Sequence, residues 1–261
     1  MGFLYFCFFS IFYYLQFHFS KYGLLAAEVW VCIILLITLF WPTFFRSRLV
    51  NIGLSASRRV IIHFLIISYC LLFVSTLIQL ENFIVEPFLT FNLFKSQYLI
   101  NSYTIFGKSF MFLFIALFLL LNQTSLQHLF SFSVLHAFLS LLNFMLLFFC
   151  FLLSVNDFFL LFIGFEGFSL TMAIISVLQV QREATLGAVK YFTLNLFATI
   201  CFLLGVLFLY QEIGSTNYFE VSFYLTQLRE TSSFISFRLQ SAIILFTIAF
   251  LFKLACFPFG M

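Results

Sequence analysis

Residues 109–156 read SFMFLFIALFLLLNQTSLQHLFSFSVLHAFLSLLNFMLLFFCFLLSVN and contain no aspartate, glutamate, lysine or arginine. The run lies between Lys108 and Asp157 and is too long for a core helix of a soluble protein. About 20 consecutive apolar residues cross a bilayer when they form a helix. The period-two alternation of a membrane barrel is absent, so we predict spanning helices rather than strands.

The whole chain has the same character, because 64% of its 261 residues are hydrophobic and only 8% are charged. A soluble domain carries about 25% charged residues, so 12 basic and 9 acidic side chains cannot cover a globular surface. The composition therefore excludes soluble enzymes and disordered proteins. A net charge of +3 without a basic patch also excludes a nucleic-acid partner. We predict an all-α polytopic membrane protein.

The apolar runs predict about seven to eight transmembrane helices. The expected spans are 24–45, 60–80, 109–121, 134–155, 158–180, 186–210 and 240–261. Residues 3–19 are a further apolar stretch, interpreted as an extra span or an interfacial helix because they lack the features of a signal peptide. This divides the chain into a hydrophobic extension (1–23), leading helices (24–133) and a third region (134–261).

Basic residues suggest how the helices are oriented. The loop between the first two main spans holds Arg46, Arg48, Arg58 and Arg59. The positive-inside rule places this loop on the cytoplasmic or matrix side, and alternation then places the loops 81–108 and 211–238 on the opposite side. Those two loops also hold Lys95, Lys108, Arg229 and Arg238.

The 6 cysteines do not predict a metal site, since they are scattered along the chain and none forms a C-x-x-C pair. We interpret them as small apolar residues within helices. No dinucleotide or phosphate-binding motif is present either, so we expect no cofactor to be bound by this chain.

Glu166 is the most central of the ionisable residues inside the expected spans. It lies about 13 Å along a helix that begins near Asp157, close to the middle of a hydrocarbon core about 30 Å thick. An acid at that depth costs about 2.5–3.5 kcal/mol on insertion scales, which favours a functional role such as proton transfer. A neutral acid bonded to a neighbouring helix is the structural alternative. Gly164 and Gly167 flank it and predict close approach of another helix.

Lys253 lies in FTIAFLFKLACFPFGM with apolar residues on both sides, about 20 Å from a helix start near Gln240. Pro258 removes a backbone hydrogen bond and clashes with the carbonyl of Leu254, so the last helix should break beside the lysine. Irregular backbone at membrane depth persists only where it is buried or lines a hydrated cavity. This pattern favours an ion path over a structural ion pair.

Other ionisable residues give weaker signals. Lys190, in EATLGAVKYFTLNLF, lies about 10 Å into its helix and can either face a path or snorkel to the interface. Glu28 lies early in its span, which is typical of an interface residue. His63 and His136 lie near span ends, where solvated histidines are ordinary. A buried acid and lysine can exchange protons with a hydrated chain, so the pattern predicts proton or cation translocation.

Three of these stretches resemble subunit 2 of respiratory complex I, the proton-pumping NADH:ubiquinone oxidoreductase. SVNDFFLLFIGFEGFSL resembles the family's S-x-N-D segment, with Glu166 at its acidic position. EATLGAVKYFTLNLF resembles the helix start that carries its lysine, here Lys190. FKLACFPFGM resembles F-K-L-A-x-x-P-F-H, with Lys253 on the proton-path lysine and Pro258 at the helix break. With the looser matches FGKSFMFLF and LLAAEVWV, the resemblance covers most of residues 24–261.

The resemblance implies part of an antiporter-like bundle of inverted repeats, in which each repeat contains a broken helix. It implies that Glu166, Lys190 and Lys253 belong to a hydrated proton path coupled to quinone reduction elsewhere in the complex. NADH, flavin, iron–sulfur clusters and quinone are then expected in other subunits. The expected partners are those subunits and membrane lipids.

The sequence departs from the family in two ways. Gly260 stands where the family usually has a histidine, so the position lacks the side chain that the family's proton relay uses there. The chain also stops at Met261, which makes 134–261 an incomplete first repeat and predicts a second polypeptide that completes a split subunit. The 46 Phe against 10 Gly suit an AT-rich organellar genome, so we expect a mitochondrial inner-membrane protein with the arginine loop in the matrix.

Two other functions fit the residues. A subunit of a Mrp-type cation/proton antiporter would share Glu166, Lys190 and Lys253, and sodium-dependent transport without NADH oxidation would identify it. A purely architectural membrane subunit would use the same charges as structural pairs. The KYF and F-K-L-A-x-x-P-F segments favour subunit 2 of complex I.

Overall fold

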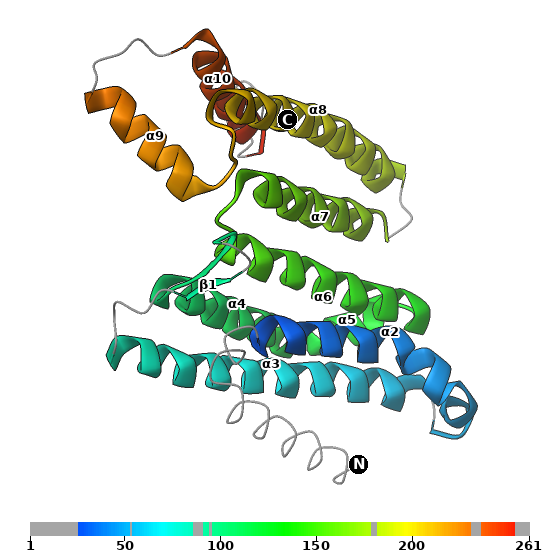
Figure 1. Cartoon of the computed structure of the whole chain (residues 1–261). Coiled ribbons are helices and arrows are strands. Elements are labelled where there is room, and N and C mark those ends of the chain that lie inside the picture. Colours follow the sequence, from blue (N-terminus) through cyan, green and yellow to red (C-terminus); the bar gives the residue numbers. More distant parts are fainter. Residues whose placement is uncertain are drawn as a thin grey trace. The chain divides into compact units, whose positions relative to one another are not determined.

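The computed structural model describes residues 26–52, 54–85, 91–93, 96–178, 182–230 and 236–253. Helices dominate this part of the chain, which confirms the all-α prediction. The elements are α2 (Ala26–Ile52), α3 (Leu54–Val85), β1 (Phe91–Leu93), β2 (Tyr98–Ile100), α4 (Ser102–Leu121), α5 (Gln123–Leu129), α6 (Phe132–Ser154), α7 (Phe158–Val177), α8 (Arg182–Ile213), α9 (Tyr218–Glu230) and α10 (Phe237–Lys253) (Figure 1). The predictions for residues 3–19, Pro258 and Gly260 lie outside the described residues.

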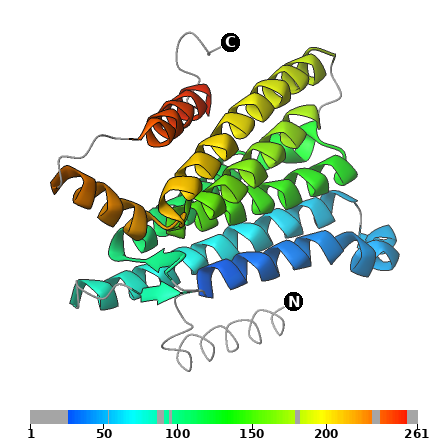
Figure 2. The ribbon, with the colours of Figure 1, turned by 45° about the horizontal axis from the view of Figure 1, so that its top comes forward.

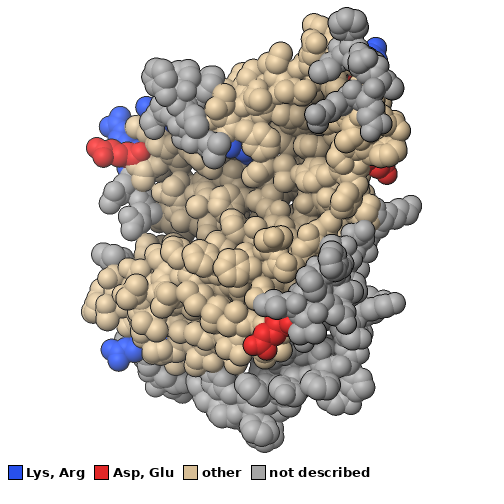
Figure 3. Space-filling view, turned by 90° about the vertical axis from the view of Figure 1, so that its left-hand side faces the viewer, with Lys and Arg blue, Asp and Glu red and all other residues tan. Residues whose placement is uncertain are grey.

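Within that part of the chain, 5 helices have the length and composition to cross a membrane. They are Arg58–Glu81, Ser102–Leu121, Phe132–Ser154, Phe158–Val177 and Arg182–Ile213, and Ala27–Phe40 is a shorter apolar helix. Uncharged side chains cover most of the described surface on the face in Figure 3, where lysine, arginine, aspartate and glutamate appear in a few places. A polytopic membrane protein is therefore confirmed.

The start of α4 corrects the sequence prediction, which placed Lys108 in a loop outside the membrane. The helix begins at Ser102, and Lys108 lies within it with 2% of its surface exposed. Before the first turn, the Asn101 backbone N–H donates to the Thr104 hydroxyl at 2.9 Å. The helix continues through the lysine because Glu28 pairs with the ammonium group inside the protein.

The chain forms two compact units, each described here by itself. Unit 1 comprises Met1–Thr90 and Ile100–Cys150, and unit 2 comprises Phe91–Leu99 and Phe151–Met261. The boundary at Cys150 falls within α6, so this helix contributes residues to both units.

Unit 1 is built from α2, α3, α4 and the larger part of α6, whose apolar faces meet in a common core. The ribbon in Figure 1 shows α3 running alongside both α2 and α4, in agreement with their contacts. Fully buried side chains in this core include Val31, Ile62, Leu65, Tyr69, Phe112, Leu119, Leu139 and Leu146.

In unit 2, α8 packs against both α7 and α10 (Figure 2). Phe202 of α8 lies at the centre of this packing with 1% of its surface exposed. Its ring lies 6.4 Å from Phe162 and 6.3 Å from Phe165 on α7, and 5.0 Å from Phe246 and 5.8 Å from Phe250 on α10. Edge-to-face and offset ring contacts therefore hold the three helices together.

Asp157 caps the first turn of α7. Its carboxylate accepts hydrogen bonds from the backbone N–H of Phe159 at 2.8 Å and of Leu160 at 3.4 Å, which satisfies donors that the helix leaves free. The Thr216 hydroxyl donates to the second carboxylate oxygen at 2.8 Å. Burial, together with the nearby Asp157 charge, raises the pKa of Tyr218 to about 12, so this phenol stays neutral at physiological pH.

Two buried asparagines hold the adjoining turn. Asn156 donates to the Ser96 carbonyl at 2.9 Å, and Asn217 donates to the Ser96 hydroxyl at 2.9 Å. Ser96 has a φ of 65°, in the left-handed region, and these bonds keep the turn in that conformation. The segment before α7 is thereby joined to the connection between α8 and α9.

The close approach of α8 and α10 predicts that Gly205 does not tolerate a large side chain. A Cβ there would lie 3.3 Å from the Phe246 ring and 3.4 Å from the Ala242 carbonyl oxygen. We expect Gly205→Leu to lower the free energy of unfolding by about 1–3 kcal/mol through overpacking. Gly187→Leu is the matched control on the same helix, because a Cβ there meets nothing within 4 Å. Equal apparent Tm values for the two variants in detergent would contradict the packing.

The cap of α7 gives a second prediction. Asp157→Ala removes the acceptor for the first turn and the partner of the Thr216 hydroxyl, so we expect a loss of about 1–2 kcal/mol in stability. Asp157→Asn keeps an amide oxygen at the same position and should lose less. The apparent Tm of both variants in detergent measures the difference, and an unchanged Tm for Asp157→Ala would show that the cap contributes nothing.

Candidate functional site

The candidate site lies in unit 2, where α7, α8 and α10 meet. Asp157 ends the extended segment before α7, and Glu166 follows about 13 Å further along the helix. Glu166 is half-buried, and its Oε2 atom is buried with no hydrogen-bond partner among the described residues. A carboxylate oxygen in that position can take up a proton or accept a bond from a water molecule.

Gly164 allows the neighbouring helix to approach this part of α7. A Cβ at Gly164 would lie 2.6 Å from a terminal carbon of Leu152 and 3.3 Å from the Phe151 ring, both in the last turn of α6. This confirms the close helix approach predicted for that glycine. Glu166 therefore lies on a helix that packs closely against α6 at a position two residues earlier.

Lys253 is the last described residue of α10 and is half-buried. Its ammonium nitrogen lies 3.4 Å from the amide oxygen of Asn195 on α8, to which it donates a hydrogen bond. The same nitrogen lies over the ring of Phe165 on α7, 4.8 Å from the centroid, which is a cation–π geometry. Glu166 and Lys253 interact electrostatically, without a direct ion pair between these two side chains.

Sequence reasoning missed two polar residues, Asn195 and Ser169, that connect Lys253 to the backbone of α7. The amide nitrogen of Asn195 donates to the Ser169 hydroxyl at 2.8 Å, and Ser169 donates to the backbone carbonyl of Glu166 at 3.0 Å. One asparagine thus bonds to both Ser169 and Lys253. Its position in the apolar middle of α8 was the available signal, but its partners become visible only when α7 and α10 pack beside α8.

The structure does not bring Lys190 to the other predicted site residues. Lys190 is exposed on α8, and its backbone carbonyl accepts a bond from Thr193 at 2.9 Å. The next residue, Tyr191, interacts electrostatically with Glu166. Large apolar side chains on α8 are also exposed, and they include Leu186, Val189, Phe197 and Ile200.

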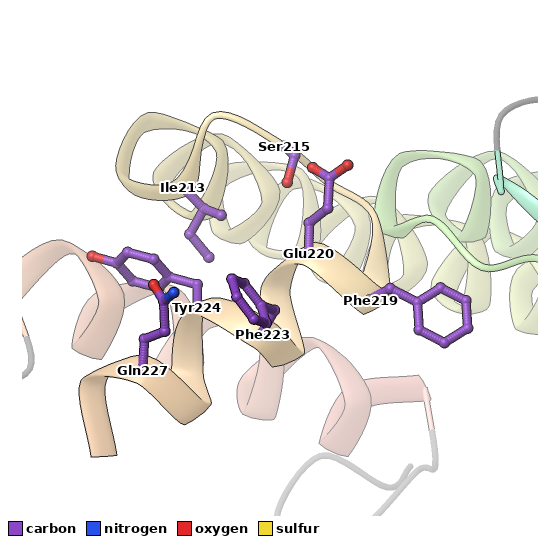
Figure 4. A pocket seen from close by; sticks show the side chains of 7 residues that line it. All are labelled: Ile213, Ser215, Phe219, Glu220, Phe223, Tyr224 and Gln227. Atoms are coloured by element: carbon purple, nitrogen blue, oxygen red, sulfur yellow. The ribbon is translucent and has the colours of Figure 1, made fainter. Parts of the chain in front are cut away.

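Two pockets lie in unit 2. A groove of about 380 Å³ between α7 and α8 is lined by Phe168, Met172, Ser176, Ala184, Gly187, Ala188 and Tyr191. A second pocket of about 470 Å³ lies between the end of α8 and α9 and is lined by Ile213, Ser215, Phe219, Glu220, Phe223, Tyr224 and Gln227 (Figure 4). The first is the more relevant to the site, because Phe168 on its wall follows Glu166 by two residues on α7.

No group of three or more His, Cys, Asp or Glu side chains in the described ranges is arranged to hold a metal ion. The cysteines in those ranges are free thiols, namely Cys32, Cys70, Cys150 and Cys201. The site in unit 2 therefore consists of a carboxylate, an ammonium group, an amide and a hydroxyl.

Unit 1 holds a buried ion pair that sequence reasoning also missed. Glu28 was expected at the interface, but it pairs with Lys108, and the two side chains are 15% and 3% exposed. His136 is half-buried rather than solvated, and its Nε2 atom is buried without a hydrogen-bond partner among the described residues. His63 is exposed as expected, with its ring 2.9 Å from the Gln123 amide nitrogen.

The candidate site lies in a part of the chain that is similar to a known protein family. Residues 155–261, which contain Glu166, Lys190 and Lys253, match the family described as NADH:quinone oxidoreductase/Mrp antiporter, transmembrane region. The chain is 32% identical over 123 residues to NADH-quinone oxidoreductase subunit N of Sulfurovum sp. (strain NBC37-1), covering 47% of this chain and 24% of that protein. The subunit N of Bdellovibrio bacteriovorus is 32% identical over 109 residues, covering 41% of this chain and 22% of that protein.

Solved structures share the fold. Respiratory complex I from Thermus thermophilus with bound aureothin contains a chain with a TM-score of 0.59 and 16% identity, covering 90% of this chain and 45% of that one. The archaeal membrane-bound sulfane sulfur reductase contains one with a TM-score of 0.63 and 17% identity, covering 89% and 46%. The chain thus spans about half the length of these neighbours. The match over residues 155–261 and the two relatives confirm the resemblance predicted from the motifs, and the solved structures show that the fold is shared.

The bonds made by Asn195 predict that this residue stabilises the junction of the three helices. Asn195→Leu leaves Ser169 and Lys253 without their shared partner, so we expect a loss of about 1–3 kcal/mol in stability. Thr199→Val is the control one turn further along α8, because the Thr199 hydroxyl bonds only to the Leu196 carbonyl of its own helix. Equal effects of the two variants on the apparent Tm in detergent would contradict the role of Asn195.

Proposed function

We propose that this chain is a proton-translocating membrane-arm subunit of an NADH:quinone oxidoreductase of the complex I type. The observation that carries the proposal is the arrangement of Glu166 and Lys253 around Asn195 and Ser169, within the region that matches the antiporter-like family. Ionisable residues inside spanning helices are characteristic of proton relays, since a bilayer otherwise penalises them.

In this proposal Lys253 and Glu166 exchange one proton. An acid and an amine that lie near each other inside a protein can exchange a proton when the distance between them changes. The lysine gives a proton through water to the free carboxylate oxygen of Glu166, leaving a neutral amine and a neutral acid. Release from the acid to one side and uptake by the amine from the other complete one transfer.

Asn195 and Ser169 hold the two groups in place. The asparagine oxygen accepts from the ammonium group of Lys253, and its nitrogen donates to Ser169, which in turn bonds to the Glu166 backbone. These bonds hold the lysine beside α7, the helix that carries Glu166, without neutralising it. The ring of Phe165 adds a further favourable contact for the charged form of Lys253.

Lys190 is the third proposed member of the path. It lies on the exposed face of α8 in the described structure, among large apolar side chains. Such a face requires cover from lipid or from further helices. We infer that additional antiporter-like helices, carried by a second polypeptide of a split subunit, cover it and bring a polar partner to Lys190.

Electron transfer is proposed to occur in other subunits of the complex. NADH, flavin, iron–sulfur clusters and ubiquinone would bind there, and this chain would contribute only the proton step. The phenylalanine-rich composition supports a mitochondrial inner-membrane location, with the arginine-bearing loop in the matrix. The relatives compared above are bacterial subunits named for the same kind of oxidoreductase.

A Mrp-type cation/proton antiporter is the second candidate, because the matched family includes both kinds of protein. Both would use Glu166 and Lys253, so the site itself does not separate them. Sodium-dependent proton exchange by the isolated assembly without NADH oxidation would favour the antiporter. Co-purification with NADH oxidation would favour the oxidoreductase.

Lys253 is the decisive residue for a test of proton transfer. Lys253→Met removes the charge, whereas Lys253→Arg keeps it on a group that does not release its proton at physiological pH. We expect both variants to lower the number of protons translocated per NADH oxidised in inside-out membrane vesicles of the host. Arg238→Gln, at the exposed start of α10, is the matched control and should leave the ratio unchanged.

The outcomes separate three roles for Lys253. A lowered ratio in both lysine variants, with the complex assembled, supports proton transfer. An unchanged ratio for Lys253→Arg combined with a loss for Lys253→Met would mean that only the positive charge is needed. Normal translocation in both variants would support the architectural alternative and overturn the proposal.

A further inference from the structure

The pocket between α8 and α9 lies where a spanning helix reaches the membrane surface. α8 has 32 residues and rises about 48 Å, which exceeds a hydrocarbon core about 30 Å thick. Its last turn carries the polar residues Gln211 and Glu212. Gly214 follows with a φ of 80°, and its backbone N–H donates to the Tyr210 carbonyl at 2.8 Å. The pocket beside this end of α8 is therefore at the level of the lipid headgroups.

The helix α9 is anchored beside the end of α8. The amide oxygen of Asn217 accepts a hydrogen bond from the backbone N–H of Phe219 at 3.0 Å, which caps the first turn. Val221, one turn further, is buried and belongs to the apolar core of unit 2. Two anchored helices and the short connection between them therefore form the walls of the pocket.

One face of α9 turns its side chains toward the pocket. Its four residues are spaced as i, i+3, i+4 and i+7, so they lie on the same side of the helix. They are Glu220, Phe223, Tyr224 and Gln227, and all four line the pocket of about 470 Å³. Figure 4 shows Phe223 between Glu220 on one side and Tyr224 and Gln227 on the other. This wall therefore combines a carboxylate and an amide with two aromatic rings.

The opposite wall contributes a buried hydroxyl. It is formed by Ile213, at the end of α8, and by Ser215 in the connection. The Oγ atom of Ser215 is buried and has no hydrogen-bond partner among the described residues. A buried polar atom without a partner costs free energy, so a ligand that bonds to it is favoured. In Figure 4 the Ser215 side chain lies at the Glu220 end of the pocket.

The lining favours a primary ammonium group. Of the described residues that line the pocket, Glu220 is the only acid and none is basic, which disfavours an anion. Aromatic rings attract a cation placed over their faces. An ammonium group of the –NH₃⁺ type also donates hydrogen bonds, which both the carboxylate and the Ser215 oxygen can accept. A quaternary ammonium group carries no N–H and would leave the hydroxyl oxygen without a donor.

Exposed apolar side chains beside the pocket favour a lipid over a soluble amine. Phe219, Phe223 and Leu225 are exposed on α9 although they are large and apolar. Aromatic residues gather at the membrane interface, where a short helix can rest against the acyl chains. A lipid would cover these side chains with its acyl chains while its headgroup enters the pocket, whereas a small soluble amine would leave them exposed.

We propose that this pocket binds the headgroup of an aminophospholipid of the phosphatidylethanolamine class. The ammonium group pairs with Glu220 and donates a second hydrogen bond to Ser215, while the rings of Phe223 and Tyr224 flank it. The phosphate of the same lipid faces the water outside the pocket. The inference goes beyond proton translocation and does not depend on it, because it needs only the position of the pocket at the membrane surface.

The experiment uses vesicles that contain the assembled complex and a photoactivatable lipid with a diazirine in one acyl chain. Two probes are compared, a phosphatidylethanolamine and a phosphatidylcholine with the same acyl chains. Mass spectrometry measures the label on residues 213–230 of this chain. Glu220→Gln and Ser215→Ala are the test variants. Glu212→Gln is the matched control, because it removes a carboxylate at the same end of α8 from a residue that does not line the pocket.

We expect the wild-type chain to be labelled more by the phosphatidylethanolamine probe. Glu220→Gln should lower this preference by about threefold or more, and Ser215→Ala should lower it less. Glu212→Gln should leave it unchanged. Equal labelling by the two probes in the wild-type chain would overturn the proposal, as would an unchanged preference in Glu220→Gln.

Two further outcomes would overturn the proposal in favour of another occupant. A preference for phosphatidylcholine would identify a quaternary ammonium site. Loss of a co-purifying subunit from Glu220→Gln, with lipid labelling unchanged, would mean that an ammonium group of a partner protein fills the pocket. The labelling requires no NADH oxidation, so its result is independent of the Lys253→Met test of the proposed function.

Discussion

The structure depends on one constraint, which is that every polar group within the hydrocarbon region must find its partner inside the protein. For the backbone this dictates helices, which make up nearly all of the described chain. For side chains it dictates where helices meet. Glu28 and Lys108 bring α2 and α4 together, and Asn195 joins α7, α8 and α10 through Ser169 and Lys253.

The two units satisfy this constraint with similar chemistry. Unit 1 combines the Glu28–Lys108 ion pair with a buried asparagine, Asn143, and unit 2 combines Glu166 and Lys253 with Asn195. The difference lies in the charges. In unit 1 the carboxylate and ammonium groups are in direct contact, whereas in unit 2 the ammonium group bonds to the Asn195 amide and not to the carboxylate. A carboxylate and an ammonium group that are not in direct contact can move apart at a lower cost than the two groups of a direct ion pair.

Sequence reasoning predicted the helices because the apolar runs are long and uninterrupted, and it located Glu166 and Lys253 because charges stand out in such runs. It did not find Asn195, whose bond to Lys253 joins residues 58 positions apart, nor the pairing of Lys108 with Glu28 across 80 positions. Periodicity describes one helix at a time, whereas these contacts depend on which helices become neighbours. The misplaced start of α4 has the same cause. A lysine beside an apolar run predicts a loop, and only the structure shows that Glu28 pairs with Lys108 inside the protein.

The pairing of Glu28 with Lys108 also has a consequence for biogenesis. Each residue alone would cost about 2.5–3.5 kcal/mol on entering the bilayer, and the two emerge from the ribosome 80 residues apart. The carboxylate of Glu28 on α2 therefore does not yet have Lys108 as a partner while α3 is being made. The ion pair can form only after α4 arrives, so we expect the leading helices to leave the insertion machinery as a group rather than one by one.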